Sequence, residues 1–133
     1  MTNGFASKKN VMRLTLAAIV VFLARTFLDF QFVFPEMFTD TATSVLALVL
    51  YAAIFGLWVH SYLGIEREQR GWLITSLVIT ALMFFGLSLS TTLVYCPTPC
   101  QTFWPYAEII NWLGNISGAA SILATFLYLR QKP

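Results

Sequence analysis

The chain has 133 residues, of which 58% are hydrophobic and only 11% are charged. A soluble domain carries about 25% charged residues, and a soluble fold with this composition would expose apolar patches that aggregate. The net charge of +2 gives no reason to expect a nucleic-acid partner. Composition therefore predicts a protein surrounded by a lipid bilayer, and length predicts a single domain over residues 1–133.

Four stretches are long and apolar enough to be transmembrane helices, since a helix needs about 20 mostly apolar residues to cross the hydrocarbon layer. They cover approximately residues 12–34, 42–63, 72–95 and 106–129. Polar or proline-containing segments separate them, and none has the alternating pattern of a barrel strand. We therefore predict an all-α integral membrane protein with four transmembrane helices in an up-down bundle.

The basic residues indicate how the bundle is oriented. Apart from Arg25, they lie before or at the start of the first span, between the second and third, and after the fourth (Lys8, Lys9, Arg13, Arg67, Arg70, Arg130 and Lys132). Cytoplasmic segments are enriched in Lys and Arg. The pattern predicts cytoplasmic N and C termini and a multi-pass protein of the cell's inner membrane.

A few polar residues lie inside the predicted spans. Arg25 and Asp29 are one helical turn apart, so an ion pair between them is expected. Glu108, Asn111 and Asn115 fall on one face of the fourth span. Charged groups in a bilayer are costly and often functional. We predict that these five residues form a polar intramembrane cluster that serves as a helix interface or binds a ligand.

Small residues four apart indicate where helices pack closely. Gly114 and Gly118 form a G-x-x-x-G motif in the fourth span, and Ala52 and Gly56 form a similar pair in the second. Such pairs allow helix backbones to approach each other. We predict helix packing at both places.

His60, the only histidine, lies near the inner end of the second span. One chain cannot therefore supply two histidines to a haem, although His60 alone could be an axial ligand to a haem or a pigment within a complex. We predict no cofactor and no metal site, and we expect an interfacial histidine with no special role.

Cys96 and Cys100, the only cysteines, lie in the predicted loop between the third and fourth spans. That loop is expected on the periplasmic or extracellular side, where disulfides form. We predict a short disulfide that fixes the turn. Thiol redox chemistry and Cu(I) binding remain as alternatives, because thiolates are soft ligands.

The stretch Cys96-Pro97-Thr98-Pro99-Cys100 resembles the Cys-Pro-x-x-Cys motif of periplasmic copper chaperones for cytochrome oxidase. The resemblance implies Cu(I) held by the two cysteines. It covers only these few residues, and the chaperones carry the motif on a thioredoxin-like fold that the four spans do not predict.

Three functions are compatible with these features. The first is an accessory or structural subunit packed within a larger membrane complex, because no motif for nucleotide, phosphate, haem or metal is found and no catalytic residue is expected. The second is a homo-oligomeric transporter or channel for small solutes or ions, with its polar site on the first and fourth helices. The third is a thiol-redox or copper-handling protein that uses the cysteine loop.

Overall fold

The computed structural model describes residues 7–32, 40–89 and 107–131. Within these ranges every regular element is helical: α1 (Lys8–Phe32), α3 (Thr41–Glu66), α4 (Arg70–Met83), the π-helix η2 (Phe84–Leu89) and α6 (Ala107–Gln131). Four helical stretches, with α4 and η2 counted as one, are long and apolar enough to cross a membrane. The predicted all-helical class with four potential spans is confirmed for the described part of the chain.

The third span is not the single α-helix that the sequence predicts. We expected one α-helix over residues 72–95, but α4 begins at Arg70 and changes at Phe84 into a π-helix. Residues 90–95 lie outside the described part. A π-helix bonds residue i to i+5 and is seldom longer than one turn within an α-helix. Hydropathy cannot distinguish the two forms, because both satisfy the backbone within the segment.

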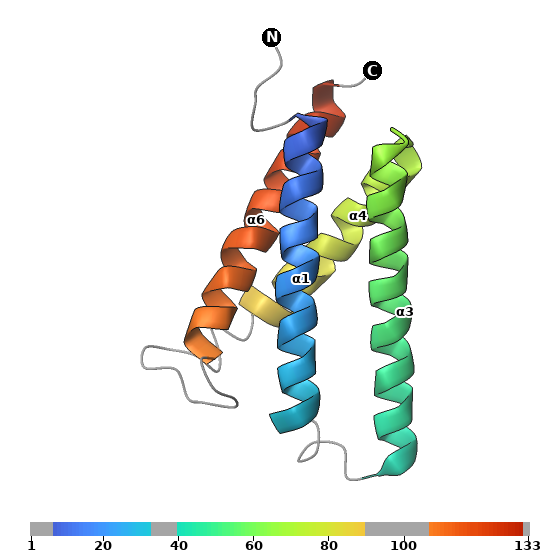
Figure 1. Cartoon of the computed structure of the whole chain (residues 1–133), viewed down its shortest axis with the longest axis vertical. Coiled ribbons are helices and arrows are strands. Elements are labelled where there is room, and N and C mark those ends of the chain that lie inside the picture. Colours follow the sequence, from blue (N-terminus) through green and yellow to red (C-terminus); the bar gives the residue numbers. More distant parts are fainter. Residues whose placement is uncertain (1–6, 33–39, 90–106, 132–133) are drawn as a thin grey trace.

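The helices are arranged around α1 (Figure 1). α1 and α6 lie side by side, and α3 stands on the opposite side of α1. α4 begins beside the end of α3 and crosses behind α1, and η2 packs on α6. The start of α1, the end of α6 and the turn between α3 and α4 lie at one end of the molecule.

Local chemistry defines both ends of α3. Asp40 is its N-cap, and a side-chain oxygen accepts a hydrogen bond from the Ala42 N–H at 3.4 Å. At the other end, Glu68 adopts a left-handed backbone conformation with φ of 58°, and the chain reverses into α4. Gly64 allows the Trp72 side chain to approach the α3 backbone, because a Cβ at position 64 would overlap the base of that side chain. The α3–α4 hairpin is therefore closed tightly at its turn.

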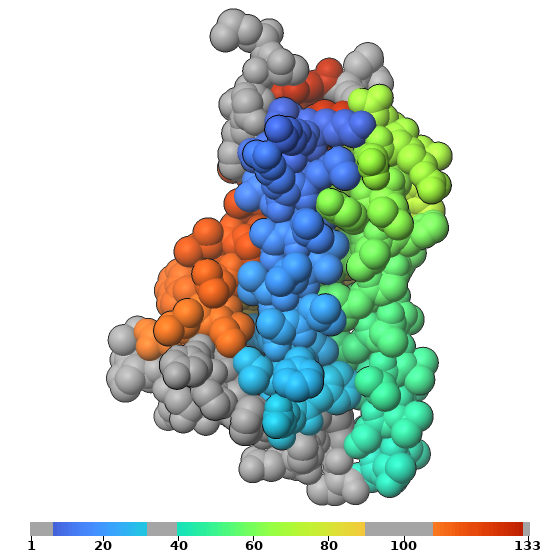
Figure 2. All heavy atoms as spheres, in the orientation of Figure 1, coloured from blue at the N-terminus to red at the C-terminus, as the bar shows by residue number. Residues whose placement is uncertain are grey.

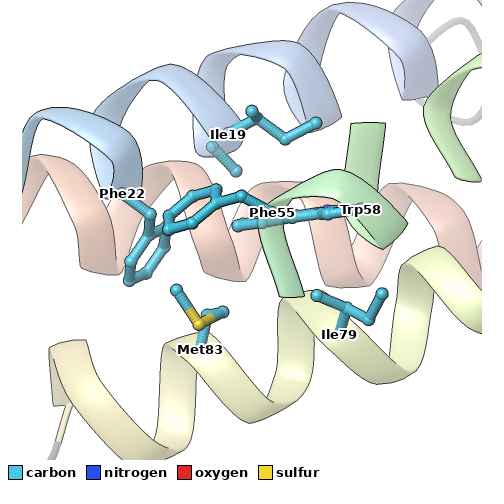
Figure 3. Packing of buried hydrophobic residues seen from close by; sticks show 7 residues of the cluster. Ile19, Phe22, Phe55, Trp58, Ile79 and Met83 are labelled. Carbon is cyan, nitrogen blue, oxygen red and sulfur yellow. The ribbon is translucent and has the colours of Figure 1, made fainter. Parts of the chain in front are cut away.

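Two apolar clusters fill the interior. The larger joins α1, α3 and α4, and it is centred on Trp58, which is fully buried (Figure 3). Phe22 and Phe55 lie against Trp58, each with its ring centroid 5.9 Å away. The smaller cluster lies toward the start of α1 and consists of Val11, Ile65, Leu73, Ala124 and Tyr128. These clusters bring side chains from all four helical segments together.

The outer surface is also apolar, most of all on α3, which forms one edge of the molecule (Figure 2). Only 11% of the most apolar window of α3 is buried, against 33–39% in the other three spans. Water would make so much exposed leucine, valine and isoleucine unfavourable, whereas lipid does not. The surface therefore fits a helix bundle embedded in a bilayer.

The tight α3–α4 turn gives a first expected outcome. Gly64→Ala places a methyl group into the Trp72 side chain, so one helix must shift at a cost of about 1–3 kcal/mol. We expect a lower melting temperature in detergent, measured by circular dichroism.

Gly56→Ala is the matched control, since no atom lies within 4 Å of a Cβ built there. Alanine favours the helix over glycine, so this variant should melt at the wild-type temperature or slightly above. Equal melting temperatures for Gly64→Ala and the wild type would contradict the close contact.

Candidate functional site

Several polar side chains of α1 point inward. Thr15, Arg25 and Asp29 are all buried, and their spacing along α1 places them on the face that also carries Phe22 of the large apolar cluster. A buried arginine in a candidate membrane span must be neutralised or hydrogen-bonded, because hydrocarbon provides no partner.

Arg25 is held by partners on two helices. Its Nε lies 3.6 Å from Asp29 Oδ2, one turn along α1. Its Nη1 donates a hydrogen bond of 2.7 Å to Asn111 Oδ1 of α6. The first contact balances the charge, and the second joins α1 to α6. Arg25 and Asp29 are only 5% and 8% exposed, so these contacts are shielded from the surroundings.

Ser88 of η2 extends this network to the third helical segment. Its hydroxyl lies 2.7 Å from Asn115 Oδ1 and 3.1 Å from the Asn111 carbonyl oxygen. Asn111 therefore contacts α1 through its side chain and η2 through its backbone. We call Arg25, Asp29, Ser88, Asn111 and Asn115 the buried polar cluster. All five residues are buried.

The two glycines of α6 make room for η2. A Cβ at Gly114 would lie 2.8 Å from Ser88 Oγ, and a Cβ at Gly118 would lie 3.1 Å from a ring carbon of Phe84. The G-x-x-x-G motif therefore faces the π-helix directly. Without side chains at these positions, the Ser88 hydroxyl can reach the polar groups of α6.

A second polar contact lies nearer the start of α1. The hydroxyls of Thr15 and Ser121 are 3.0 Å apart, and both residues are fully or almost fully buried. Along α1, Thr15 lies between Val11 of the small apolar cluster and Ala18 of the large one. Apolar side chains therefore separate this contact from the buried polar cluster.

Other predicted site residues lie elsewhere. Glu108 is half-buried in the first turn of α6 and makes no ion pair with a described residue. Ala52 and Gly56 lie on the exposed side of α3, which none of the described helices covers. His60 is also exposed, and its ring meets Trp72 edge-on with the centroids 4.6 Å apart.

The structure leaves the cysteine predictions open. Cys96 and Cys100, with the proposed disulfide and the Cu(I) alternative, lie outside the described residues. Within the described ranges, no three His, Cys, Asp or Glu side chains are grouped so that they could hold a metal ion.

No protein-family model matches the chain, and no curated protein or solved structure shows a significant match to it.

Sequence reasoning missed Ser88, Thr15 and Ser121. Thr15 carries a usable signal, because Val11, Thr15, Ala18, Phe22, Arg25 and Asp29 follow an alternating spacing of four and three residues along one face of α1. Ser88 has no such signal. The preceding buried residue of its span is Met83, five positions earlier, and α-helical spacing does not connect the two.

Removing the Ser88 hydroxyl should loosen η2. Ser88→Ala leaves acceptors of Asn111 and Asn115 without this donor, at an expected cost of about 1 kcal/mol. Its melting temperature in detergent should fall. Ser117→Ala is the control, because Ser117 is half-buried and its hydroxyl makes only a long hydrogen bond of 3.4 Å, to a carbonyl of its own helix. A loss as large in Ser117→Ala would remove the special role of Ser88.

The ion pair gives a sharper test. Asp29→Asn leaves the buried Arg25 charge without its counter-ion, and breaking a buried pair in this way costs about 3–5 kcal/mol. Arg25→Gln together with Asp29→Asn removes both charges and should be more stable than Asp29→Asn alone. Denaturant unfolding in detergent gives the free energy of unfolding of the double variant and of each single variant, Asp29→Asn and Arg25→Gln. A double variant whose loss equals the sum of the single losses would contradict the pairing.

Proposed function

We propose that this protein is an accessory, structural subunit of a larger complex in the cell's inner membrane. In this proposal all four spans cross the bilayer as an up-down bundle, with both termini in the cytoplasm and the Cys96–Cys100 segment on the opposite side. The distribution of Lys and Arg supports the orientation. The single observation that supports the subunit role most strongly is the outward face of α3.

The outward face of α3 has the spacing of a helix-packing seam. Its members recur at alternating intervals of four and three residues, the repeat that keeps one stripe of a helix against a neighbour. They are exposed, and small residues occupy the centre of the stripe: Val45, Val49, Ala52, Gly56, Val59 and Leu63. Small residues let helices associate closely in lipid. We assign this face to a helix of another subunit.

The polar groups support a structural role. The hydrogen bonds of the buried polar cluster connect α1, η2 and α6 to one another. The large apolar cluster lies between it and the Thr15–Ser121 contact. A bundle whose polar groups bind its own helices together in this way suits a packing subunit better than a pore within one chain.

A second candidate is a homo-oligomeric transporter or channel for small solutes or ions, with its polar site on α1 and α6. The buried Arg25–Asp29 pair favours it, because charges within membrane spans often mark transport pathways. The thiol-redox or copper-handling alternative depends on Cys96 and Cys100. Under that alternative, replacing either cysteine with serine abolishes the activity.

Purification from native membranes in mild detergent tests the subunit role. We expect the protein to co-elute with different, larger subunits. Ala52→Leu adds bulk to the centre of the outward face and should reduce the co-eluting subunits several-fold without lowering the melting temperature of this chain. Ala17→Leu, which changes an exposed alanine of α1, should leave the complex intact.

Two results would contradict the proposal. A homogeneous homo-oligomer without other subunits would exclude the accessory role and support the transporter. Equal losses in Ala52→Leu and Ala17→Leu would show that the outward face of α3 is not the contact.

A further inference from the structure

A groove of about 570 Å³ lies between α3 and α4. Its walls are almost entirely apolar: Tyr51, Ile54, Leu57, Ile74, Thr75, Val78, Ile79, Leu82, Met83 and Leu87. Several of these side chains are exposed, including Leu82 at 67% and Val78 at 51%, so the groove opens at the molecular surface. Its volume is within the range of about 300–1,000 Å³ of small-molecule sites.

The groove follows from how α4 and η2 are held. At the start of α4, Trp72 packs closely against Gly64 of α3. At the other end, Phe84 and Ser88 pack on the two glycines of α6. The third helical segment is therefore bound to α3 at one end and to α6 at the other, and it moves away from α3 along its length (Figure 1).

The end of the groove nearest the α3–α4 turn lies beside charges of both signs. Arg70 is on the same helical ridge as Ile74, Val78 and Leu82, at intervals of one turn. The turn before α4 carries Glu66, Arg67 and Glu68, and all three are exposed, as is Arg70. The apolar groove therefore leads to a surface with two cations and two anions.

We propose that this groove binds one acyl chain of a phosphatidylethanolamine-type phospholipid, with the headgroup on the Glu66–Arg70 turn. From Ile74 to Leu87 the groove extends about 20 Å at 1.5 Å per residue. That length and the apolar walls suit an acyl chain. Arginine donates charge-assisted hydrogen bonds to phosphate, and the carboxylates accept them from a primary ammonium group.

Charge complementarity selects this headgroup over two common alternatives. A phosphatidylglycerol headgroup has a phosphate but no cation to face Glu66 and Glu68. A phosphatidylcholine headgroup has a cation, but its quaternary ammonium has no N–H to donate to the carboxylates. The inference requires the chain to lie in a bilayer but does not depend on the accessory-subunit role, so either can fail without the other.

The test is lipid retention by the full chain. The protein is reconstituted into bilayers with equal parts of phosphatidylethanolamine, phosphatidylglycerol and phosphatidylcholine, extracted in mild detergent, and examined by native mass spectrometry. We expect one retained lipid, with phosphatidylethanolamine enriched several-fold. Val78→Trp fills the groove and should reduce retention several-fold. Val20→Trp, at an equally apolar site of similar exposure on α1, should not.

The headgroup is tested separately. Arg70→Gln should reduce the preference for phosphatidylethanolamine several-fold, whereas Arg13→Gln, at an exposed arginine of α1, should not. Equal retention in Val78→Trp and Val20→Trp would overturn the groove as the binding site. Equal retention of all three lipids by the wild type would overturn the headgroup assignment. Loss of a bound protein subunit in Val78→Trp, with lipid retention unchanged, would mean that a protein helix occupies the groove.

Discussion

The structure depends on the inability of hydrocarbon to hydrogen-bond the polar groups placed in it. Helices satisfy the backbone, so the constraint applies to the few polar side chains inside the spans. Arg25 meets it through Asp29 and Asn111, and Ser88 meets it through α6. Because the Arg25–Asn111 and Ser88–Asn115 contacts join different helices, the groups that are most costly to bury also determine which helices are neighbours.

The same contacts explain the unusual path of the third helical segment. The π-helix brings Ser88 onto the buried face, and the missing side chains of Gly114 and Gly118 give it room on α6. With its other end held against α3 at Gly64, this segment must cross the bundle diagonally. The groove beside α4 and the exposed outward face of α3 are consequences of that crossing. Both proposed binding surfaces therefore follow from a few close contacts at glycines.

The sequence predicts the features that depend on hydropathy and simple periodicity. The number of potential spans follows from the hydropathy of the chain. The proximity of Arg25 to Asp29 follows from their spacing of four residues within one helix. The contact from Arg25 to Asn111 requires the packing of α1 on α6, which one sequence does not specify. Ser88 was missed because a π-helix shifts the buried face by one residue, and no residue type marks that shift. Ala52 and Gly56 illustrate the reverse case, since their small-residue pattern is present but no helix in the described part of the chain covers it.

Thiol accessibility in intact cells tests the central claim, that the helices cross a bilayer in alternating directions, most directly. A chain without its native cysteines would carry one new cysteine, either Asp40→Cys before α3 or Glu68→Cys between α3 and α4, both exposed positions. A membrane-impermeant thiol reagent added outside should label Asp40→Cys in intact cells, and Glu68→Cys only after the membrane is opened. Equal labelling of both positions in intact cells would contradict a crossing by α3, and with it the placement of the polar cluster within the membrane.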